Sequence, residues 1–322
     1  MELLKNLCIS SGVSGFEAQI KETIINEIKD YAEIKILPSG DLVAFVSGES
    51  REKTVCFFAP LDENGFLISG FDENGNARLT AVGKTAPESL FGKKVSANGK
   101  IGVISQIPVH LSSEEDKKRL LKTEELSVDF GFENKTDAEK ELCEGAPVCF
   151  APAFFKEGNK IFAKSVETRA SVYALIEIIK KKPKYNTFFV FAVCEKTGFS
   201  GSKTAAFYLK PDIAVYLDFA CAENELKLGG GIALTRFTQT AFSDAELFVK
   251  AKEVFEEEKI PYQLLLQKGD ANGAGEIAAS NGGAAVLTLS LPVKNANTPL
   301  GIADENDISS LIKAIEALNE RI

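Results

Sequence analysis

The chain has 322 residues, of which 45% are hydrophobic and 26% are charged, and this predicts a globular protein with one large domain or two unequal ones. Its 46 acidic residues outnumber the 37 Lys and Arg residues, giving a net charge of -9, which argues against a nucleic acid or an anionic membrane as partner. No apolar run is long enough to span a bilayer and no leader with an apolar centre begins the sequence, so we expect a cytoplasmic protein.

The chain contains six cysteines and one histidine. The cysteines lie mostly within apolar runs and form no Cys-x-x-Cys pair, which favours reduced core thiols over disulfides or a zinc clamp. Cys194 and Cys221 lie at odd spacing from Glu195 and Asp218 on their strands, so we expect both thiols in the core, on the opposite face. A single histidine, His110, excludes any mechanism that needs two.

The first predicted elements are one helix and three strands. Ser14-Gly15-Phe16-Glu17 has the form of a capping box and predicts a helix that runs to about Tyr31. Short β-rich runs follow at 33–37, 42–47 and 54–59, and the last is a continuous apolar run, typical of a strand buried on both faces. That strand ends in a polar segment, Pro60 to Gly65.

The sequence between residues 67 and 162 has a different character. It contains short β-rich runs with hairpin signals at Asn74-Gly75 and Asn98-Gly99, and it shows little helical periodicity. We interpret it as an inserted β-barrel-like domain, which leaves residues 1–66 and 163–322 to form the main domain.

Helices and strands alternate after the insertion, a pattern typical of an α/β fold. We expect helices at 172–179, about 202–209, 244–259, about 275–280 and from about Glu305, and strands at 187–194, 213–218, 262–266 and 284–291. Gly229-Gly230-Gly231 lacks both the Lys-Ser/Thr continuation and the preceding strand of a phosphate-binding loop, so we interpret it as a flexible turn.

Polar side chains follow several of the predicted strands, and in open α/β sheets function gathers at such strand ends. Asp62, Glu195 with Lys196, and Asp218 each follow an apolar run, while Glu167 opens the helix after the insertion. We expect these four carboxylates and the lysine to converge at one rim of the sheet. The alternative is that they are ordinary solvated acids at strand ends and a helix start.

Several segments together resemble the tetrahedral and glutamyl aminopeptidases, metallopeptidase family forty-two, some of whose members have been labelled endoglucanases. They are Gly12-Val13-Ser14-Gly15-Phe16-Glu17, Phe91-Gly92-Lys93-Lys94-Val95, Lys100-Ile101-Gly102-Val103-Ile104, residues 189–201 and Ala205-Ala206. The resemblance covers nearly the whole chain. It implies an α/β fold, an αβα sandwich with a mixed sheet, interrupted by a smaller β domain that in relatives helps assembly into dimers and tetrahedral dodecamers.

The metal-binding positions are where the chain departs from the family pattern. By this resemblance Pro60 replaces a zinc-binding histidine, Lys196 replaces a glutamate ligand, and Asn297 replaces the final histidine ligand. Glu167 stands for the aspartate that bridges two metals in relatives, and Asp218 retains a second anionic ligand. The metal-holding set is therefore degraded at three positions.

The positions of the supporting aspartate and the general base, Asp62 and Glu195, are both retained. A catalytic zinc needs about three protein ligands, and a protonated lysine has no lone pair to offer. Without a metal, no bound water is acidified for Glu195 to activate. We therefore expect neither zinc nor cobalt as a cofactor, and we expect Lys196 to replace part of the missing positive charge by pairing with Glu167 or Asp218.

Three functions remain open from the sequence. The first is a non-catalytic family member that binds peptides or serves as an assembly subunit, as a homo-oligomer or beside an active paralogue. The second is an active aminopeptidase with one zinc or cobalt ion, or an unusual site, held by Glu167 and Asp218. The third is a purely structural oligomer, which no peptide would stabilise against heat.

Overall fold

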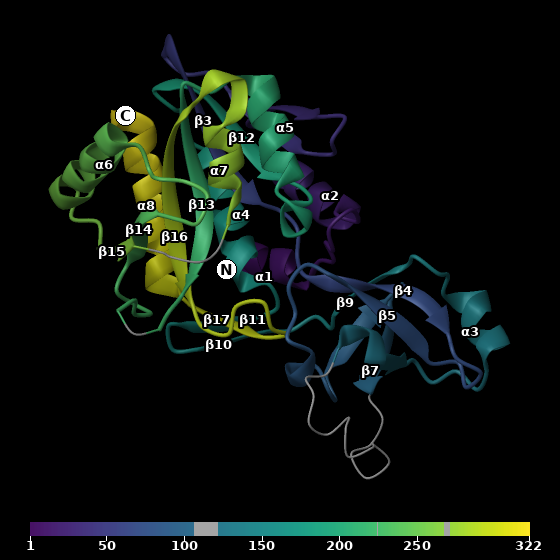
Figure 1. The fold of residues 1–322 in the computed structure, drawn as a ribbon. Coiled ribbons are helices and arrows are strands. Elements are labelled where there is room, and N and C mark those ends of the chain that lie inside the picture. Colours follow the sequence, from purple (N-terminus) through teal and green to yellow (C-terminus); the bar gives the residue numbers. More distant parts are fainter. Residues whose placement is uncertain (106–121, 224, 267–270) are drawn as a thin grey trace.

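The computed structural model describes residues 1–105, 122–223, 225–266 and 271–322. A large α/β body stands beside a smaller β-barrel, and the two are joined near the start of β4 and the end of β9 (Figure 1). The predicted division into a main part and an inserted β part is visible in this arrangement. His110 lies outside the described residues.

The centre of the large body is an eight-stranded sheet with the order β1-β2-β12-β3-β13-β16-β14-β15. Its strands are β1 (Glu33–Ile36), β2 (Leu42–Val46), β3 (Ser50–Pro60), β12 (Tyr185–Ala192), β13 (Ile213–Cys221), β14 (Ile232–Phe237), β15 (Tyr262–Leu266) and β16 (Ala285–Val293). The four central strands β12, β3, β13 and β16 are parallel, whereas β2 and β14 pair with them in the antiparallel sense. The sheet is therefore mixed.

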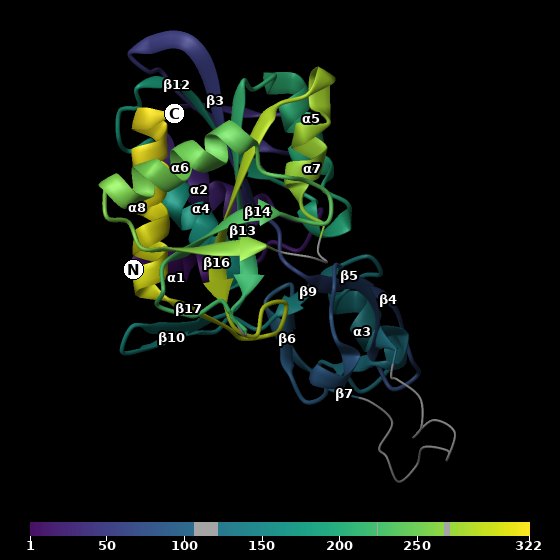
Figure 2. The same cartoon turned by 60° about the vertical axis from the view of Figure 1, so that its left-hand side comes forward.

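Helices cover both faces of this sheet (Figure 2). On one face lie α1 (Glu2–Ile9), α2 (Ala18–Ile28), α4 (Val166–Ile179), α6 (Ala245–Glu257) and α8 (Glu305–Arg321), and on the other lie α5 (Ser200–Leu209) and α7 (Gly273–Ala278). The central strands present apolar side chains to both helix layers, with Phe57 and Phe189 stacked at 5.7 Å on one side. Burial of both sheet faces explains the continuous apolar run that predicted β3. The predicted αβα sandwich is confirmed.

The inserted segment forms a closed barrel with the order β4-β5-β8-β7-β6-β9. Its elements are β4 (Gly65–Phe71), β5 (Ala77–Val82), β6 (Lys94–Ala97), β7 (Lys100–Ser105), β8 (Ser127–Asp129), α3 (Lys135–Glu141) and β9 (Pro147–Phe150). Both predicted hairpins are present, with Gly75 at φ +82° and the pair Asn98 and Gly99 at φ +48° and +78°. The barrel-like insertion is confirmed.

A small third sheet lies next to the barrel and has the order β10-β11-β17. It joins β10 (Phe154–Glu157) and β11 (Lys160–Ala163) to β17 (Gly301–Asp304), close to the C-terminal helix α8. The strands at 154–163 therefore pair with the C-terminal part of the chain, outside the barrel. The domain boundaries at 66 and 162 stay a prediction.

The predicted capping box at residues 14–17 is wrong. Helix α2 begins at Ala18, and the hydroxyl of Ser14 donates to Asp62 and not to a helix amide. Glu17 accepts from the backbone N–H groups of Gly15 at 2.9 Å and Cys194 at 3.2 Å. Both side chains are thus used in tertiary contacts near the strand ends, which sequence spacing does not reveal.

The three-glycine segment that precedes β14 is held in place, contrary to the flexible turn we expected. The backbone N–H groups of Gly229 and Gly231 each donate to the carboxylate of Asp307 at 2.7 Å. Asp307 is fully buried in the first turn of α8. The segment is thus fastened to the start of the last helix.

Candidate functional site

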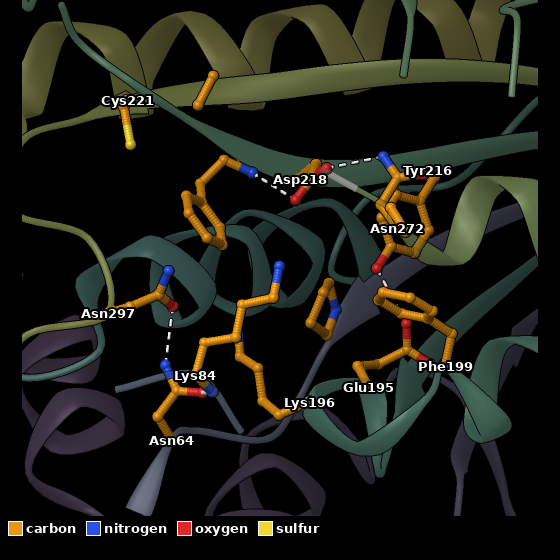
Figure 3. A pocket seen from close by; sticks show the side chains of 14 residues that line it. Asn64, Lys84, Glu195, Lys196, Phe199, Tyr216, Asp218, Cys221, Asn272 and Asn297 are labelled. Carbon is orange, nitrogen blue, oxygen red and sulfur yellow. Dashed lines mark hydrogen bonds between the residues drawn. The ribbon is translucent and has the colours of Figure 1, made fainter. Parts of the chain in front are cut away.

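A pocket lies near the ends of β3 and β12 and beside the last residues of β13 (Figure 3). Its cavity volume is about 110 Å³. Five of the predicted positions line it, namely Pro60, Glu195, Lys196, Asp218 and Asn297. The structure therefore brings these side chains together at one rim of the sheet. Strand-end reasoning predicted this for Glu195, Lys196 and Asp218, and the family resemblance pointed to Pro60 and Asn297.

Asp62 and Glu167 lie beside this pocket and are bonded to its lining. One carboxylate oxygen of Asp62 accepts from the Ser14 hydroxyl and, at 2.8 Å, from the backbone N–H of Lys196. Burial raises the pKa of Asp62, and the charge of Lys196 opposes that rise. One oxygen of Glu167 accepts from the backbone N–H of Asn297 at 3.1 Å. All of the predicted site positions thus belong to one neighbourhood.

Each of these two acids also has one buried oxygen without a hydrogen-bond partner in the described part of the chain. They are Oδ1 of Asp62 and Oε2 of Glu167. Leaving a buried acceptor unpaired costs about 1–3 kcal/mol in a typical protein. Two such atoms next to a pocket indicate that folding stability alone does not explain the arrangement of this site.

Glu195 is buried and each of its carboxyl oxygens has a protein partner. Oε1 accepts from the backbone N–H of Ser202 at 2.8 Å, and Oε2 accepts from the Tyr216 hydroxyl at 2.9 Å. Burial, with a smaller contribution from the negative charge of Asp62, raises the pKa of Glu195 to about 8. At neutral pH the metal-free chain therefore holds this carboxyl mainly in its protonated form, which cannot act as a general base.

Asp218 is fixed by two nitrogen donors. Its Oδ1 accepts from the backbone N–H of Phe219 at 2.8 Å, and its Oδ2 accepts from the side-chain amide of Asn272 at 2.7 Å. Asn272 is buried and starts α7. Both oxygens of this carboxylate therefore already accept a hydrogen bond from a nitrogen donor.

Lys196 makes a different contact from the one we predicted. Its ammonium group lies 5.1 Å from the centre of the Phe219 ring, and within the described residues it forms no ion pair with Glu167 or Asp218. The predicted ion pair is therefore wrong. The aromatic ring supplies a weaker, shorter-range attraction for the cation, and the acids instead accept N–H donors from nearer groups.

A chain of hydrogen bonds fixes the orientation of Asn297. Oδ1 of Asn64 accepts from the backbone N–H of Lys84 at 3.1 Å, so the amino group of Asn64 faces the other way and donates to Oδ1 of Asn297 at 2.7 Å. Figure 3 shows this amide pair on the wall of the pocket. The side-chain amino group of Asn297 is thereby left as the donor on the pocket side.

A buried charged cluster lies next to the pocket and was not predicted. The carboxylate of Glu63 accepts from Lys164 at 2.5 and 2.8 Å, from the Ser165 hydroxyl at 2.7 Å, and from the backbone N–H of Gly12 at 2.9 Å. Arg169 lies 3.5 Å from the same carboxylate. Burial raises the pKa of Glu63, but the charges of Lys164 and Arg169 outweigh it and leave the pKa below its ordinary value.

Two of our expectations about cysteines need correction. Cys221 and Cys143 are exposed, and Cys221 lines the pocket. The pairing of β13 with β3 stops at Tyr216, so the last residues of β13, Cys221 among them, lie beyond the end of that pairing, and odd spacing from Asp218 does not place this thiol in the core. Cys8, Cys56 and Cys149 are buried free thiols, as predicted.

Several residues of the pocket were not singled out from the sequence. They are Asn64, Lys84, Phe199, Tyr216, Phe219 and Asn272. The one available signal was the position of Asn64, two residues after Asp62 in the polar segment that ends β3. Lys84, Phe199 and Asn272 come from loops and helix starts, where spacing carries little information, whereas Tyr216 and Phe219 lie within β13.

The donor atoms of this site do not match those of a two-zinc centre. Among the residues that the structure describes, no group of three or more His, Cys, Asp or Glu side chains is placed to hold a metal ion. Asn297 offers an uncharged amide and Lys196 a cation where strong donors are needed. The residues present therefore do not fit such a centre.

Comparison with known proteins identifies the family. A family model described as M42 glutamyl aminopeptidase matches residues 40–314. The chain belongs to this aminopeptidase family. Lysyl aminopeptidase of Pyrococcus furiosus is 25% identical to it, in an alignment that covers 100% of this chain and 97% of that protein.

Solved structures of aminopeptidase-family proteins have the same fold. The TET1 peptidase of Pyrococcus horikoshii, described as able to assemble into a tetrahedron or a large octahedral shell, is 30% identical, with a TM-score of 0.91 and coverage of 100% of this chain and 99% of that one. A TET aminopeptidase from a Thaumarchaeota archaeon has a TM-score of 0.96 at 23% identity, covering 100% and 97%. Within the described residues, no helix is both long enough and apolar enough to cross a membrane.

Proposed function

We propose that this aminopeptidase-family chain is a non-catalytic member that binds peptides without hydrolysing them. The observation that carries the proposal is the bonding of the retained acids. In the metal-free arrangement Asp62, Glu167 and Asp218 accept hydrogen bonds from N–H groups of Lys196, Asn297 and Asn272, at 2.8, 3.1 and 2.7 Å. Each of these bonds competes with a metal ion for a lone pair of the carboxylate. Asp218 has both oxygens engaged in this way, whereas Asp62 and Glu167 each use one.

The substitutions support the same conclusion. Pro60 has no side-chain donor atom, and Lys196 carries a positive charge that would repel a bound cation. The general-base position, Glu195, is retained but has a pKa of about 8, so a carboxylate is scarce at neutral pH without a neighbouring metal. Retention of a pocket beside these residues favours binding over a purely structural role.

The test is metal analysis combined with an activity assay. The full chain is loaded with zinc or cobalt, dialysed, and assayed for metal content and for hydrolysis of a panel of aminoacyl-nitroanilides. We expect less than one metal ion per chain and no turnover above that of the Glu195→Gln variant. One or two ions per chain with steady turnover, lost in Glu195→Gln, would overturn the proposal.

A second candidate is an active aminopeptidase with a single or unusual metal ion at Glu167 and Asp218. The observation that favours it is the pair of unpartnered buried oxygens, Oδ1 of Asp62 and Oε2 of Glu167, which could accept a cation. In that case the double variant Pro60→His with Asn297→His should change an existing activity only modestly. Activity that rises from zero in the double variant would count against this candidate.

We also propose that the chain assembles with copies of itself or with an active paralogue, and that the inserted segment of residues 67–162, which contains most of the barrel, contributes to this. The support is the similarity to the TET1 peptidase, whose assembly into closed shells is stated for that protein. Light scattering of the purified chain, alone and with an active relative, measures the assembly. A peptide that raises the melting temperature separates a binding subunit from a structural one.

A further inference from the structure

We propose that the pocket recognises the α-carboxylate at the C-terminal end of a peptide, with the ammonium group of Lys196 and the side-chain amide of Asn297 as its donors. The inference rests on the proposed peptide binding and adds to it which end of the peptide enters. An aminopeptidase acts at the opposite end, where a peptide carries its ammonium group. The peptide would therefore enter this pocket in the opposite orientation to an aminopeptidase substrate.

The first support is the state of Lys196. It lines the pocket and is half-buried, and in the part of the chain that the structure describes its ammonium group has no carboxylate partner within ion-pair distance. The Phe219 ring, 5.1 Å away, covers only one side of the cation. An ammonium group has three donors and no acceptor, so a ligand that offers anionic oxygens would satisfy it.

The second support is the direction of the hydrogen bonds through Asn64 and Asn297. The backbone N–H of Lys84 fixes the carbonyl side of Asn64, whose amino group must then face the carbonyl of Asn297. Asn297 is thereby left with its amino group for a ligand, while its own backbone N–H is used by Glu167 at 3.1 Å. A donor amide therefore accompanies the lysine on the pocket lining.

The acids of the pocket do not offer a competing site for a peptide ammonium. Both oxygens of Glu195 accept hydrogen bonds, from Ser202 and Tyr216, and both oxygens of Asp218 accept hydrogen bonds, from Phe219 and Asn272. Asp218 does add a negative charge to the lining, and this charge opposes a bound carboxylate. Its two fixed donors hold it at the Asn272 side of the pocket, across from Asn64 and Asn297 in Figure 3.

The remaining lining explains why a peptide end fits better than a small inorganic anion. Rings of Phe199, Tyr216 and Phe219, with the side chain of Ala220, form an apolar wall next to the donors. The cavity volume of about 110 Å³ suits a carboxylate with the side chain of one terminal residue. A free phosphate would leave the apolar wall uncovered and would gain nothing from it.

The experiment is a calorimetric titration of the full chain with three tripeptides, two blocked forms of Ala-Ala-Phe and one variant of it, Ala-Glu-Phe. The first is N-acetylated with a free carboxylate, the second has a free amine and a C-terminal amide, and the third is blocked at both ends with glutamate in the middle position. We expect the acetylated acid to bind at least tenfold more tightly than the other two. Inorganic phosphate should not displace it.

The variants Lys196→Met, Lys196→Arg and Asn297→Ala locate the contact, and Lys182→Met is the matched control because Lys182 is an exposed lysine outside the pocket lining. Lys196→Met should weaken binding of the acetylated acid at least tenfold. Asn297→Ala should weaken it less, and Lys196→Arg and Lys182→Met should bind within about threefold of the wild type. Melting curves establish that each variant is folded.

Four results would overturn the inference. They are equal or tighter binding of the C-terminal amide, equal binding of the doubly blocked acidic peptide, displacement by phosphate, and no binding of any form. Unchanged affinity in a folded Lys196→Met variant would also do so. None of these binding results shows whether the chain hydrolyses peptides. Steady nitroanilide turnover with bound metal refutes the proposed function, whichever peptide end is preferred.

Discussion

Asp62 and Glu63 are adjacent in sequence and both are buried, yet their surroundings differ. Glu63 is held by Lys164, by the Ser165 hydroxyl and by a backbone N–H, with Arg169 3.5 Å away. Asp62 has no cationic partner at ion-pair distance among the described residues, and one of its oxygens has no partner at all.

The charged residues at the end of β3 thus serve two different purposes. The Glu63 cluster connects the N-terminal loop, the strand end and the start of α4, so it holds the walls of the site in place. Asp62 lies beside the pocket and accepts from the Ser14 hydroxyl and from the backbone N–H of Lys196. The Glu63 carboxylate is therefore bonded to a cation, whereas Asp62 is bonded to neutral donors.

The largest expected effect comes from breaking the Glu63 cluster. Lys164→Met removes a fully buried cation and leaves the Glu63 carboxylate undercompensated, which should lower the free energy of unfolding by about 3–5 kcal/mol. Urea unfolding followed by circular dichroism measures it. The double variant with Glu63→Gln should recover part of the loss, and a loss below about 1 kcal/mol in the single variant would contradict this account.

The next effect concerns the pH dependence caused by Glu195. The pKa of Glu195 is raised from 4.5 to about 8, so between these pH values the folded metal-free chain keeps a proton that the unfolded chain has released. The resulting stability is fully present below pH 4.5 and is lost as pH rises through 8. Relative to Glu195→Gln, the wild type should lose about 2 kcal/mol of unfolding free energy between pH 6 and pH 8. Parallel stability profiles would show that the carboxyl is already ionised.

The smallest of the three effects concerns the hydrogen bond between Ser14 and Asp62. Ser14→Ala removes one donor from a buried carboxylate that keeps the Lys196 backbone N–H, and it should cost about 1–2 kcal/mol. Ser309→Ala serves as the control, because this exposed hydroxyl bonds only within its own helix and should change stability by less than about 0.5 kcal/mol. A Ser14→Ala loss as small as that of the control would mean that Asp62 does not depend on this hydroxyl.

Much of the fold follows from patterns that the sequence displays. Strand β15 was predicted with its bounds unchanged, and α8 begins at the predicted Glu305, because a short apolar run and helix-start acids are local signals. Helix α1 and strand β14 were not predicted. Helix α1 packs against α4, and β14 pairs with both β15 and β16, contacts that local sequence patterns do not reveal.

The sequence predicts the site residues that follow strand ends. It does not predict the contacts that depend on the direction of a side chain. The convergence of Asp62, Glu195 and Asp218 follows from topology, because parallel strands end at the same edge of a sheet. The stacking of Lys196 on the Phe219 ring depends on which rotamer the lysine adopts. The order of residues in the sequence does not determine that rotamer. The hydrogen bond between Asn64 and Asn297 likewise depends on side-chain direction, and it joins residues 233 positions apart.

The fastening of Gly229 and Gly231 to Asp307 has a consequence for the order in which the molecule opens. Both amide protons are shielded from exchange with water only while the first turn of α8 is docked. Strand β14 follows these glycines directly and lies next to the edge strand β15. We therefore expect local unfolding at the start of α8 to expose the residues that lead into β14, more than seventy positions earlier in the sequence.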